Sequence, residues 1–381
     1  MPAKRFSPPT CYIRGIGYYL PPEIRKNSWW NDHFQSNRIQ ANPRTIVFDG
    51  DLDQPTGSQI HDLQLDQERI QSEQRKLMDQ VRKDPNRGTK ERRVASIPPS
   101  KMEIRAASAA LEDAKLNPSE IGAIIVASTP GDHLSPNNAT TIQMELGCSA
   151  IPCLGVDSAC TSFLTGLNQL YGLLAVSDFE HGLLVVSSQF TQLTSSEDPL
   201  AKTAGDGAAA VILSRSKGIQ GILSHVQCGY PHWRDAVRCG SSDGTPFWRG
   251  ESPIIGKTWD EERSRELIMN CSYLARKHFD LALDRAGVDR QEIRHFHCHQ
   301  ATAWMNAACK QACGLEHTQT VNTFDRIANV GAANIPINLS IAKQAGHFQD
   351  GDLIATFSLG MGVTIAASIL RWIDDSCLSP I

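Results

Sequence analysis

The sequence predicts an α/β protein in which two halves share one order of strands and helices. Its 381 residues suit one large α/β domain or two similar halves. Short apolar strands alternate with helices from about residue 101 onward, which implies a sheet covered on both faces. The order of helix, short polar loop and apolar strand occurs at 103–128 and again at 260–299. We therefore expect a duplicated αβ unit, with halves at 1–217 and 218–381.

The first half opens with a predicted strand at 11–20, which ends at two prolines. The strongly polar stretch 30–90 then departs from the core, and its helical propensity predicts one helix near 60–83. We interpret this insertion as a solvated charged face, with a lid or a dimer arm as the alternative. The remaining elements predicted in this half are helices at 103–116, 137–146 and 161–176 and strands at 123–128, 153–157, 183–188 and 208–213.

The second half repeats the same order of elements. A long predicted helix at 260–286 is followed by a strand at 294–299. The elements predicted after it are helices at 307–314 and 335–346 and strands at 353–359 and 363–372.

Composition limits the class of protein. Apolar residues make up 41% and charged residues 20% of the chain, as in ordinary globular proteins. A net charge of -4 gives no reason to expect nucleic acid or an anionic membrane as a partner. No secretory signal and no run of roughly 18 apolar residues is present. Eleven cysteines without regular spacing indicate reduced thiols, so we expect a cytoplasmic protein.

Cys160 is the candidate nucleophile. It follows a short apolar strand and precedes a long helix, and a helix N-terminus lowers the pKa of a thiol. Small residues at 158, 159, 161 and 162 leave room around the sulfur. The alternative is a small buried hydrophobic residue, which is the usual role of a cysteine.

Two further polar residues follow predicted strands or lie in loops. His299 ends the strand at 294–299, and Asn329 lies in a loop of small residues. Side chains at strand ends meet at one edge of the sheet, where α/β proteins place their sites. We expect both to lie beside Cys160.

Six segments together resemble a known family. They are GIGYYLPP, DSACTSFLTGL, GDGAAAVIL (205–213), HQAT (299–302), ANVGAANIP (328–336) and SLGMGVT (358–364). With them the chain resembles thiolase-fold condensing enzymes of the β-ketoacyl-acyl-carrier-protein synthase III type, over nearly all of its length except about 30–85. The resemblance implies a thiolase-like fold with a five-layered α-β-α-β-α core.

The resemblance also implies roles for single residues. Cys160 would be the acylated nucleophile, and His299 and Asn329 would hydrogen-bond the thioester carbonyl of the extender unit. Backbone N–H groups of Cys160 and of the turn with Gly360 and Met361 would form the oxyanion hole. Fixed donors of this kind stabilise the negative charge of an enolate or a tetrahedral intermediate.

Substrates and assembly follow from the same resemblance. It implies thioesters of coenzyme A or of the phosphopantetheine of acyl carrier protein as substrates, no permanently bound cofactor, and a homodimer. Leu134 would reach across the two-fold axis and form the end wall of the partner's acyl tunnel. A leucine there would leave a longer tunnel than an aromatic residue. An ordinary loop leucine at a subunit contact is the alternative.

The entrance to the site departs from the family pattern. Arg82 and Asn86 stand where a tryptophan and an arginine are common, Trp304 stands where an arginine is usual, and Thr302 replaces an asparagine. The segment 195–204 is short and lacks the usual arginine.

Phosphate groups of the donor thus lose bidentate partners. The sequence indicates that either Arg92, Arg93 and Lys202 substitute for them, or the donor differs. We interpret the chain as a specialised relative in fatty-acid-like or polyketide-like secondary metabolism.

Two other patterns carry no predicted site. His295, His297 and His299 alternate along a strand, but no second ligand cluster with zinc spacing accompanies them, so we expect no metal. The Gly205-Asp206-Gly207 turn lacks the features of a phosphate loop, and we interpret it as a tight turn that requires a positive φ.

Three functions remain open at this point. The first is decarboxylative Claisen condensation on a thioester. The second is transfer of the acyl group to an alcohol or amine, which Asn329 opposes because an amide cannot serve as a base. The third is a non-catalytic partner subunit, which would be expected to have lost one of the catalytic residues.

Overall fold

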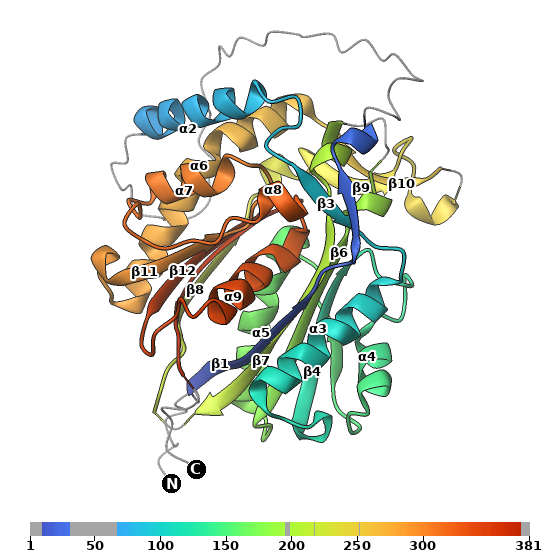
Figure 1. Cartoon of the computed structure of the whole chain (residues 1–381), viewed down its shortest axis with the longest axis vertical. Helices are drawn as coiled ribbons and strands as arrows, with labels where there is room; N and C mark the ends of the chain where they lie inside the picture. Colours follow the sequence, from blue (N-terminus) through green and yellow to red (C-terminus); the bar gives the residue numbers. More distant parts are fainter. Residues whose placement is uncertain (1–9, 31–66, 195–198, 217, 251, 375–381) are drawn as a thin grey trace.

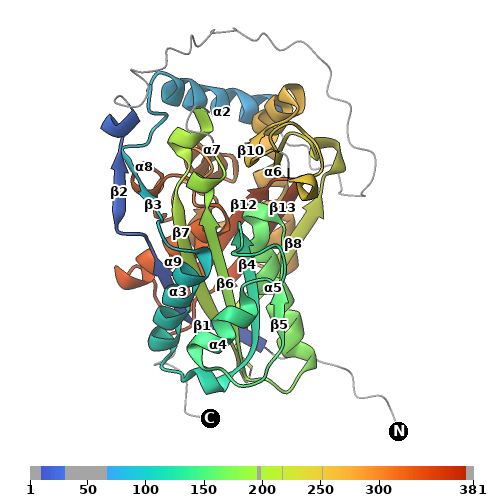
Figure 2. The same cartoon turned by 90° about the vertical axis from the view of Figure 1, so that its right-hand side faces the viewer.

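The computed structural model describes residues 10–30, 67–194, 199–216, 218–250 and 252–374. Two sheets lie face to face with helices between them and on both outer sides (Figure 1; Figure 2). The predicted five-layered α-β-α-β-α core is confirmed. No helix among the described residues is long and apolar enough to cross a membrane.

The first sheet has five strands in the order β1-β7-β6-β4-β5. Their bounds are β1 Thr10–Tyr19, β7 Asp206–Ser216, β6 His181–Gln189, β4 Ile121–Thr129 and β5 Cys153–Gly155. β4 is parallel to both β5 and β6, and β7 is antiparallel to β1 and β6. The outer face carries α3 (Pro99–Ala114) and α4 (Ala139–Leu146), and the inner face carries α5 (Ser162–Val176) and α9 (Asn334–Gln344).

The second sheet has four strands in the order β11-β12-β13-β8. Their bounds are β11 Ile293–Cys298, β12 Leu353–Gly360, β13 Thr364–Arg371 and β8 Ile222–Gly229. Its outer face packs on α6 (Glu261–Ala286) and α7 (Met305–Ala312), and its inner face contributes to the core around α5 and α9.

Alternation along the strands produces these layers. In β7, Ala208, Ala210 and Ile212 point to the outer core with α3, whereas Val211 and Leu213 point to the inner core with α5. Both faces are apolar because the side chains of a strand alternate between two buried surfaces.

Glycines in β1 allow α3 to lie unusually close to the first sheet. A Cβ atom at Gly15 would lie 2.4 Å from the backbone oxygen of Ala110, and one at Gly17 would lie 2.4 Å from the nitrogen of Ala110. Alanines dominate the buried face of α3, so backbone meets backbone at this contact. The closeness of helix and strand therefore depends on the absence of side chains on both.

The same capping motif precedes the first parallel strand in each half. Asn117 and Glu120 form a capping box before β4, and Asp289 and Glu292 form one before β11. In both, the glutamate accepts a backbone hydrogen bond at 2.7 Å. This repetition supports a duplicated unit, and the division of the chain at residue 217 stays a prediction.

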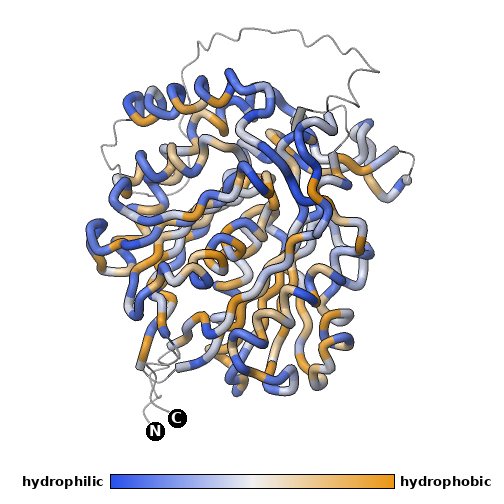
Figure 3. Tube along the Cα trace, viewed as in Figure 1, coloured by the Kyte–Doolittle hydropathy of each residue, from blue (hydrophilic) through white to orange (hydrophobic). Residues whose placement is uncertain are grey.

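The polar insertion is described only from Gln67 on. The helix predicted near 60–83 is present as α2 (Gln67–Arg82), which packs on α6 and α7 through Ile70, Gln74 and Met78. Residues 31–66, which hold the rest of this prediction, lie outside the described residues. Figure 3 shows hydrophilic residues along most of α2 and hydrophobic ones along the central strands.

Several short strands were not predicted. They are β2 (Glu23–Lys26), which pairs with β3 (Glu91–Val94), β8, and the pair β9 (Val237–Ser241) and β10 (Ile254–Thr258).

Candidate active site

Cys160 lies in a single 3-10 turn, Ala159–Thr161, directly before α5. Ala159 has a positive φ of 52°, which is unusual for a residue with a side chain. The Thr161 hydroxyl donates to the Ser158 carbonyl at 2.7 Å, and the Ser358 hydroxyl donates to the Cys160 carbonyl at 2.8 Å. The turn is therefore fixed to the second sheet as well as to its own helix.

The structure brings Cys160, His299, Asn329 and Met361 to one cavity of about 240 Å³. Apolar side chains form most of its wall. The other lining residues are Phe190, Thr194, Thr203, Ala204, Val237, Cys239, Gly256, Ser264, Leu267, Ile268, Cys271, Ala301, Thr302, Trp304, Met305, Leu359 and Val363. Among the described residues, no acidic or basic side chain other than the histidine lines it.

Asn329 is held by the backbone of Gly331, and His299 lies close to the same backbone. The Gly331 N–H donates to Asn329 Oδ1 at 2.9 Å, so the group that Asn329 retains for the cavity is its Nδ2 amide donor. Burial lowers the pKa of His299 to about 4, and the nearby Gly331 backbone offsets this only in part, while His299 Nδ1 is buried without a hydrogen-bond partner. The imidazole is therefore neutral at neutral pH.

A residue with a side chain would be strained at position 331. Gly331 has a φ of +53°, and a Cβ there would lie 3.0 Å from Ser188 Oγ and 3.2 Å from the Phe190 ring. The backbone of Asn329 is tied on its other side, where its N–H donates to Thr203 O at 2.8 Å.

The expected low pKa of Cys160 is not borne out. Burial raises the pKa of this thiol to about 12, with a smaller upward effect from Cys239, and a backbone hydrogen bond lowers it only in part. Sequence position beside a helix N-terminus does not reveal that the sulfur is enclosed. The thiol is thus protonated at rest, and its proton has to leave during acyl transfer.

The turn after β12 lies against the nucleophile. Met361 packs against Cys160, and a Cβ at Gly360 would lie 2.4 Å from the Ser158 carbonyl. Gly362 has a φ of +97°. This places the backbone of the turn beside the sulfur, while the oxyanion-hole role of Met361 and Gly360 stays a prediction.

The expected positive φ in the Gly205-Asp206-Gly207 turn is wrong. Neither glycine has one. Gly205 is needed instead because a Cβ there would lie 1.9 Å from the Ile327 carbonyl. Asp206 begins β7 and accepts hydrogen bonds from the N–H groups of Ala95 at 2.8 Å and Thr191 at 3.0 Å.

Other predicted residues lie apart from the cavity. Leu134 is 82% exposed and does not line it, so its reach into a partner subunit stays a prediction. His295 forms a 3.0 Å contact with Asp352 and stacks on His297 at 6.4 Å between ring centres. Among the described residues no group of three or more potential ligands could hold a metal ion.

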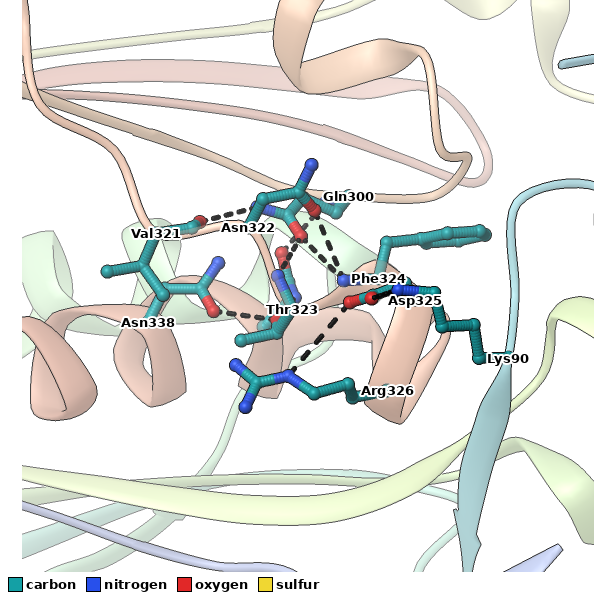
Figure 4. Close-up of polar contacts among 10 residues, drawn as sticks. Lys90, Gln300, Val321, Asn322, Thr323, Phe324, Asp325, Arg326 and Asn338 are labelled. Atoms are coloured by element: carbon teal, nitrogen blue, oxygen red, sulfur yellow. Dashed lines mark hydrogen bonds and ion pairs between the residues drawn. The ribbon is translucent and has the colours of Figure 1, made fainter. Parts of the chain in front are cut away.

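Gln300 holds the loops of His299 and Asn329 together, and the sequence reasoning missed it (Figure 4). Its Nε2 donates to Val321 O at 2.8 Å, and its Oε1 accepts from the N–H groups of Thr323 at 3.0 Å and Phe324 at 3.2 Å. Its own N–H donates to Asn334 Oδ1 at 2.8 Å.

The Asn329 loop runs from Phe324 to Asn334, so Gln300 binds both of its ends directly beside His299. Gln300 is fully buried. The sequence feature that could have identified Gln300 is its place directly after His299 in the HQAT segment.

We expect the Gln300→Leu variant to lose ~3 kcal/mol of unfolding free energy. Leucine fills the space but leaves the Val321 carbonyl and the Thr323 N–H buried without partners. The Phe324 N–H keeps Asn322 Oδ1 at 3.2 Å. Chemical denaturation measures the loss, and the exposed Gln311→Leu on α7 is the control, with a change within about 0.5 kcal/mol. Equal stability of the two variants would contradict this role for Gln300.

Buried neutral histidines predict a loss of stability on acidification. Burial lowers the pKa of His297 to about 3 and those of His278 and His299 to about 4. Below pH 6.5 the unfolded chain binds protons that the folded chain excludes, so stability falls as the pH drops from 6.5 toward 4. The raised pKa values of Asp206, about 6, and of Glu103 act in the opposite direction.

The lowered pKa of His297 alone should reduce the free energy of unfolding by ~2 kcal/mol when the pH drops from about 7 to about 5. Unfolding of wild type and His297→Leu measured at both pH values isolates this contribution. The variant should lose less stability than wild type over that range. A parallel loss in both proteins would show that His297 is not the cause.

The fold and the cavity together define the class. Two layered α/β halves with a cysteine at the start of the buried central helix form a thiolase-type fold. A crystal structure of 3-oxoacyl-(acyl-carrier-protein) synthase III from Aquifex aeolicus VF5 superimposes with a TM-score of 0.74, at 23% identity, over 95% of this chain and 100% of that one.

Sequence comparisons give the family. Models described as 3-oxoacyl-(acyl-carrier-protein (ACP)) synthase III and its C terminal match residues 154–229 and 283–372. β-Ketoacyl-(acyl-carrier-protein) synthase III of Rickettsia canadensis is 26% identical over 72% of this chain and 84% of its own length. A 3-oxopimeloyl-(acyl-carrier-protein) synthase of Rhodothermus marinus is 28% identical over 72% and 79%. Together these comparisons support a thiolase-fold condensing enzyme of the β-ketoacyl-acyl-carrier-protein synthase III type.

Proposed function

We propose that Cys160 accepts an acyl group as a thioester and that this group then undergoes decarboxylative Claisen condensation. In the first step the Cys160 sulfur attacks the carbonyl carbon of an acyl thioester. The bond from that carbon to the donor sulfur breaks, and the thiol proton of Cys160 passes to the leaving sulfur. Splitting the transfer in two replaces one difficult step by two easier ones.

In the second step a malonyl-type thioester supplies the carbon nucleophile. A β-ketoacyl-type thioester, the other expected extender, has no carboxylate to lose and would instead have to give up its α-proton to a base. A malonyl unit loses carbon dioxide, and the electron pair left behind forms an enolate whose oxygen faces His299 and Asn329. The enolate carbon attacks the Cys160 thioester, and the sulfur of Cys160 leaves and regains a proton from water. Donors fixed in advance at the enolate oxygen lower the barrier because they need no reorganisation.

The observation that carries this proposal is that the described residues of the cavity wall include no carboxylate. Among the described residues, the polar groups beside Cys160 are a neutral imidazole and an amide, both able to donate without taking a proton. Transfer to an alcohol or amine requires a base for the incoming nucleophile, and an amide cannot supply one. A non-catalytic partner subunit has no need of all three groups in one cavity.

The substrates and assembly are part of the same proposal. Acyl-coenzyme A or acyl carrier protein would deliver the acyl group, no cofactor would stay bound, and the product would enter fatty-acid-like or polyketide-like secondary metabolism in the cytoplasm. The exposed Leu134 supports a homodimer in which this side chain enters the partner's tunnel.

Intact mass spectrometry tests the proposal. The protein is incubated with acyl-coenzyme A and acyl-carrier donors, and the modified residue is found by peptide mapping. Malonyl donors are then added and released carbon dioxide is measured. An adduct on Cys160 followed by carbon dioxide release supports condensation. An adduct without release favours transfer to an alcohol or amine, and no adduct with any donor would eliminate both functions.

A further inference from the structure

A second, smaller cavity adjoins the active site. Its volume is about 40 Å³, and a site of about 10–15 Å³ by this measure holds one water. It therefore has room for a carboxylate-sized group. Thr194 lines both cavities. The other lining residues are Arg25, Trp29, Trp30, Arg92, Thr191 and Ala201.

Two neighbouring arginines line this cavity. Arg25 on β2 pairs directly with Arg92 on β3 in the antiparallel register. Directly opposed like charges on paired strands are destabilising. Arg92 is only 1% exposed, so water does not screen its charge. Burial and Arg25 lower the pKa of Arg92 to about 10, which leaves it charged at neutral pH.

The hydrogen-bonding capacity of these arginines is largely unused. Arg92 Nη2 donates to Asn27 Oδ1 at 2.6 Å, while Arg92 Nε and Nη1 and Arg25 Nε are buried without a hydrogen-bond partner. Buried polar groups are nearly always paired, and an unpaired one is costly. The Arg92 guanidinium also lies 4.9 Å from the Trp30 ring centre, a contact that offsets only part of this cost.

Carboxylates on the protein do not neutralise Arg92. Among the described residues, Arg92 forms no ion pair, and Arg25 has only Glu23 at 3.7 Å, whose side chain is 53% exposed. Asp206 interacts electrostatically with Arg25. Its oxygens, however, accept hydrogen bonds from the N–H groups of Ala95 and Thr191 and from the Thr191 hydroxyl.

We propose that this cavity binds an oxyanion carried by the thioester substrate, held by Arg92 and Arg25. The planar guanidinium fork suits bidentate binding of a carboxylate or phosphate. Two groups of a thioester substrate have this chemistry: a carboxylate at the far end of the acyl chain, and the phosphate of the phosphopantetheine arm. The substrate part rests on the proposed function, because the cavity is tied to the substrate only through Thr194, which also lines the cavity that holds Cys160.

Titration calorimetry with inorganic phosphate and with glutarate tests the binding itself on the full chain. Arg92→Met should weaken the binding about 10- to 100-fold. The matched control is Lys26→Met, on the residue of β2 that follows Arg25. Lys26 is exposed and does not line the cavity, so this variant should bind within about 2-fold of wild type.

If Arg92→Met does not fold, the more exposed Arg25→Met takes its place. Absence of binding in wild type, or equal loss in the Lys26 control, would overturn the proposal.

Two pairs of donors then identify the source of the oxyanion. Glutaryl-coenzyme A is compared with pentanoyl-coenzyme A, and S-acyl-phosphopantetheine with S-acyl-pantetheine, by the rate of Cys160 acylation. In one pair the charged donor should react about 10- to 100-fold faster, and Arg92→Met should remove that advantage.

If neither pair differs while pentanoyl-coenzyme A still acylates Cys160, the substrate part is wrong and the proposed function stands. If no donor acylates Cys160, the proposed function fails, while the phosphate and glutarate titrations still decide whether the cavity binds anions.

Discussion

The Cys160→Ala variant is expected to form no acyl adduct with any donor, whereas Cys239→Ala keeps it. Both thiols line the same cavity, so both can be reached by a donor. A difference between the two variants therefore reports the position of the sulfur in the site and not its accessibility. Only Cys160 lies in the turn before α5, beside His299, Asn329 and the turn that holds Met361. Intact mass spectrometry after incubation with acyl-coenzyme A reads the result directly.

The structure gives a reason for this difference between two cysteines. The Cys160 turn is fixed by the Thr161 and Ser358 hydroxyls, so its sulfur is held in place before the substrate binds. Cys239 lies on β9, a strand that pairs only with β10 among the described strands. An adduct that persisted in Cys160→Ala, or disappeared in Cys239→Ala alone, would move the nucleophile to Cys239.

The His299→Ala variant is expected to release carbon dioxide from a malonyl donor about 100- to 1,000-fold more slowly than wild type. Loss of one fixed donor to a developing oxyanion has an effect of this size. Acylation of Cys160 should change much less, because with a pKa near 4 His299 is a poor base for a thiol whose pKa is near 12. Single-turnover acylation and carbon dioxide release, measured on the same preparation, separate the two steps.

A matched control accompanies this variant. His133 is exposed, and its replacement by alanine should leave both rates unchanged. If His299→Ala slowed acylation and decarboxylation equally, His299 would be needed for acylation as well. The proposal that His299 acts only by donating to the enolate oxygen would then be wrong. If neither rate changed, His299 would have no role in the reaction.

The core strands could be predicted from the sequence because they are buried on both faces. β4, β6 and β7 are short continuous apolar runs between turns, and such runs are visible without any knowledge of their neighbours. β2 and β3 were missed because Glu23–Lys26 and Glu91–Val94 are rich in charged residues and gain their structure from pairing with each other. Pairing of segments this far apart leaves no local pattern.

Placement of the candidate site could be predicted for a related reason. Cys160, His299 and Asn329 adjoin the ends of recognisable elements, and the layered fold brings those ends together. The pKa of Cys160 could not be predicted, because enclosure of the sulfur depends on side chains from both halves. Gly205 was misinterpreted because its constraint is the distant Ile327 carbonyl rather than its own torsion angle.

The contact between α2 and α6 supports a part of the cavity wall from outside, through residues that do not line the cavity themselves. Gln74 of α2 accepts from the Ser272 N–H at 3.0 Å and donates to the Ile268 carbonyl at 2.6 Å, so its amide joins two peptide groups one turn apart in α6. Ile268 and Cys271 of that turn line the cavity. Substitutions in α2, none of whose residues lines the cavity, can thus alter the width of the cavity. If the cavity holds the acyl chain as proposed, the preferred chain length can change through the polar insertion while the residues that line the cavity stay the same.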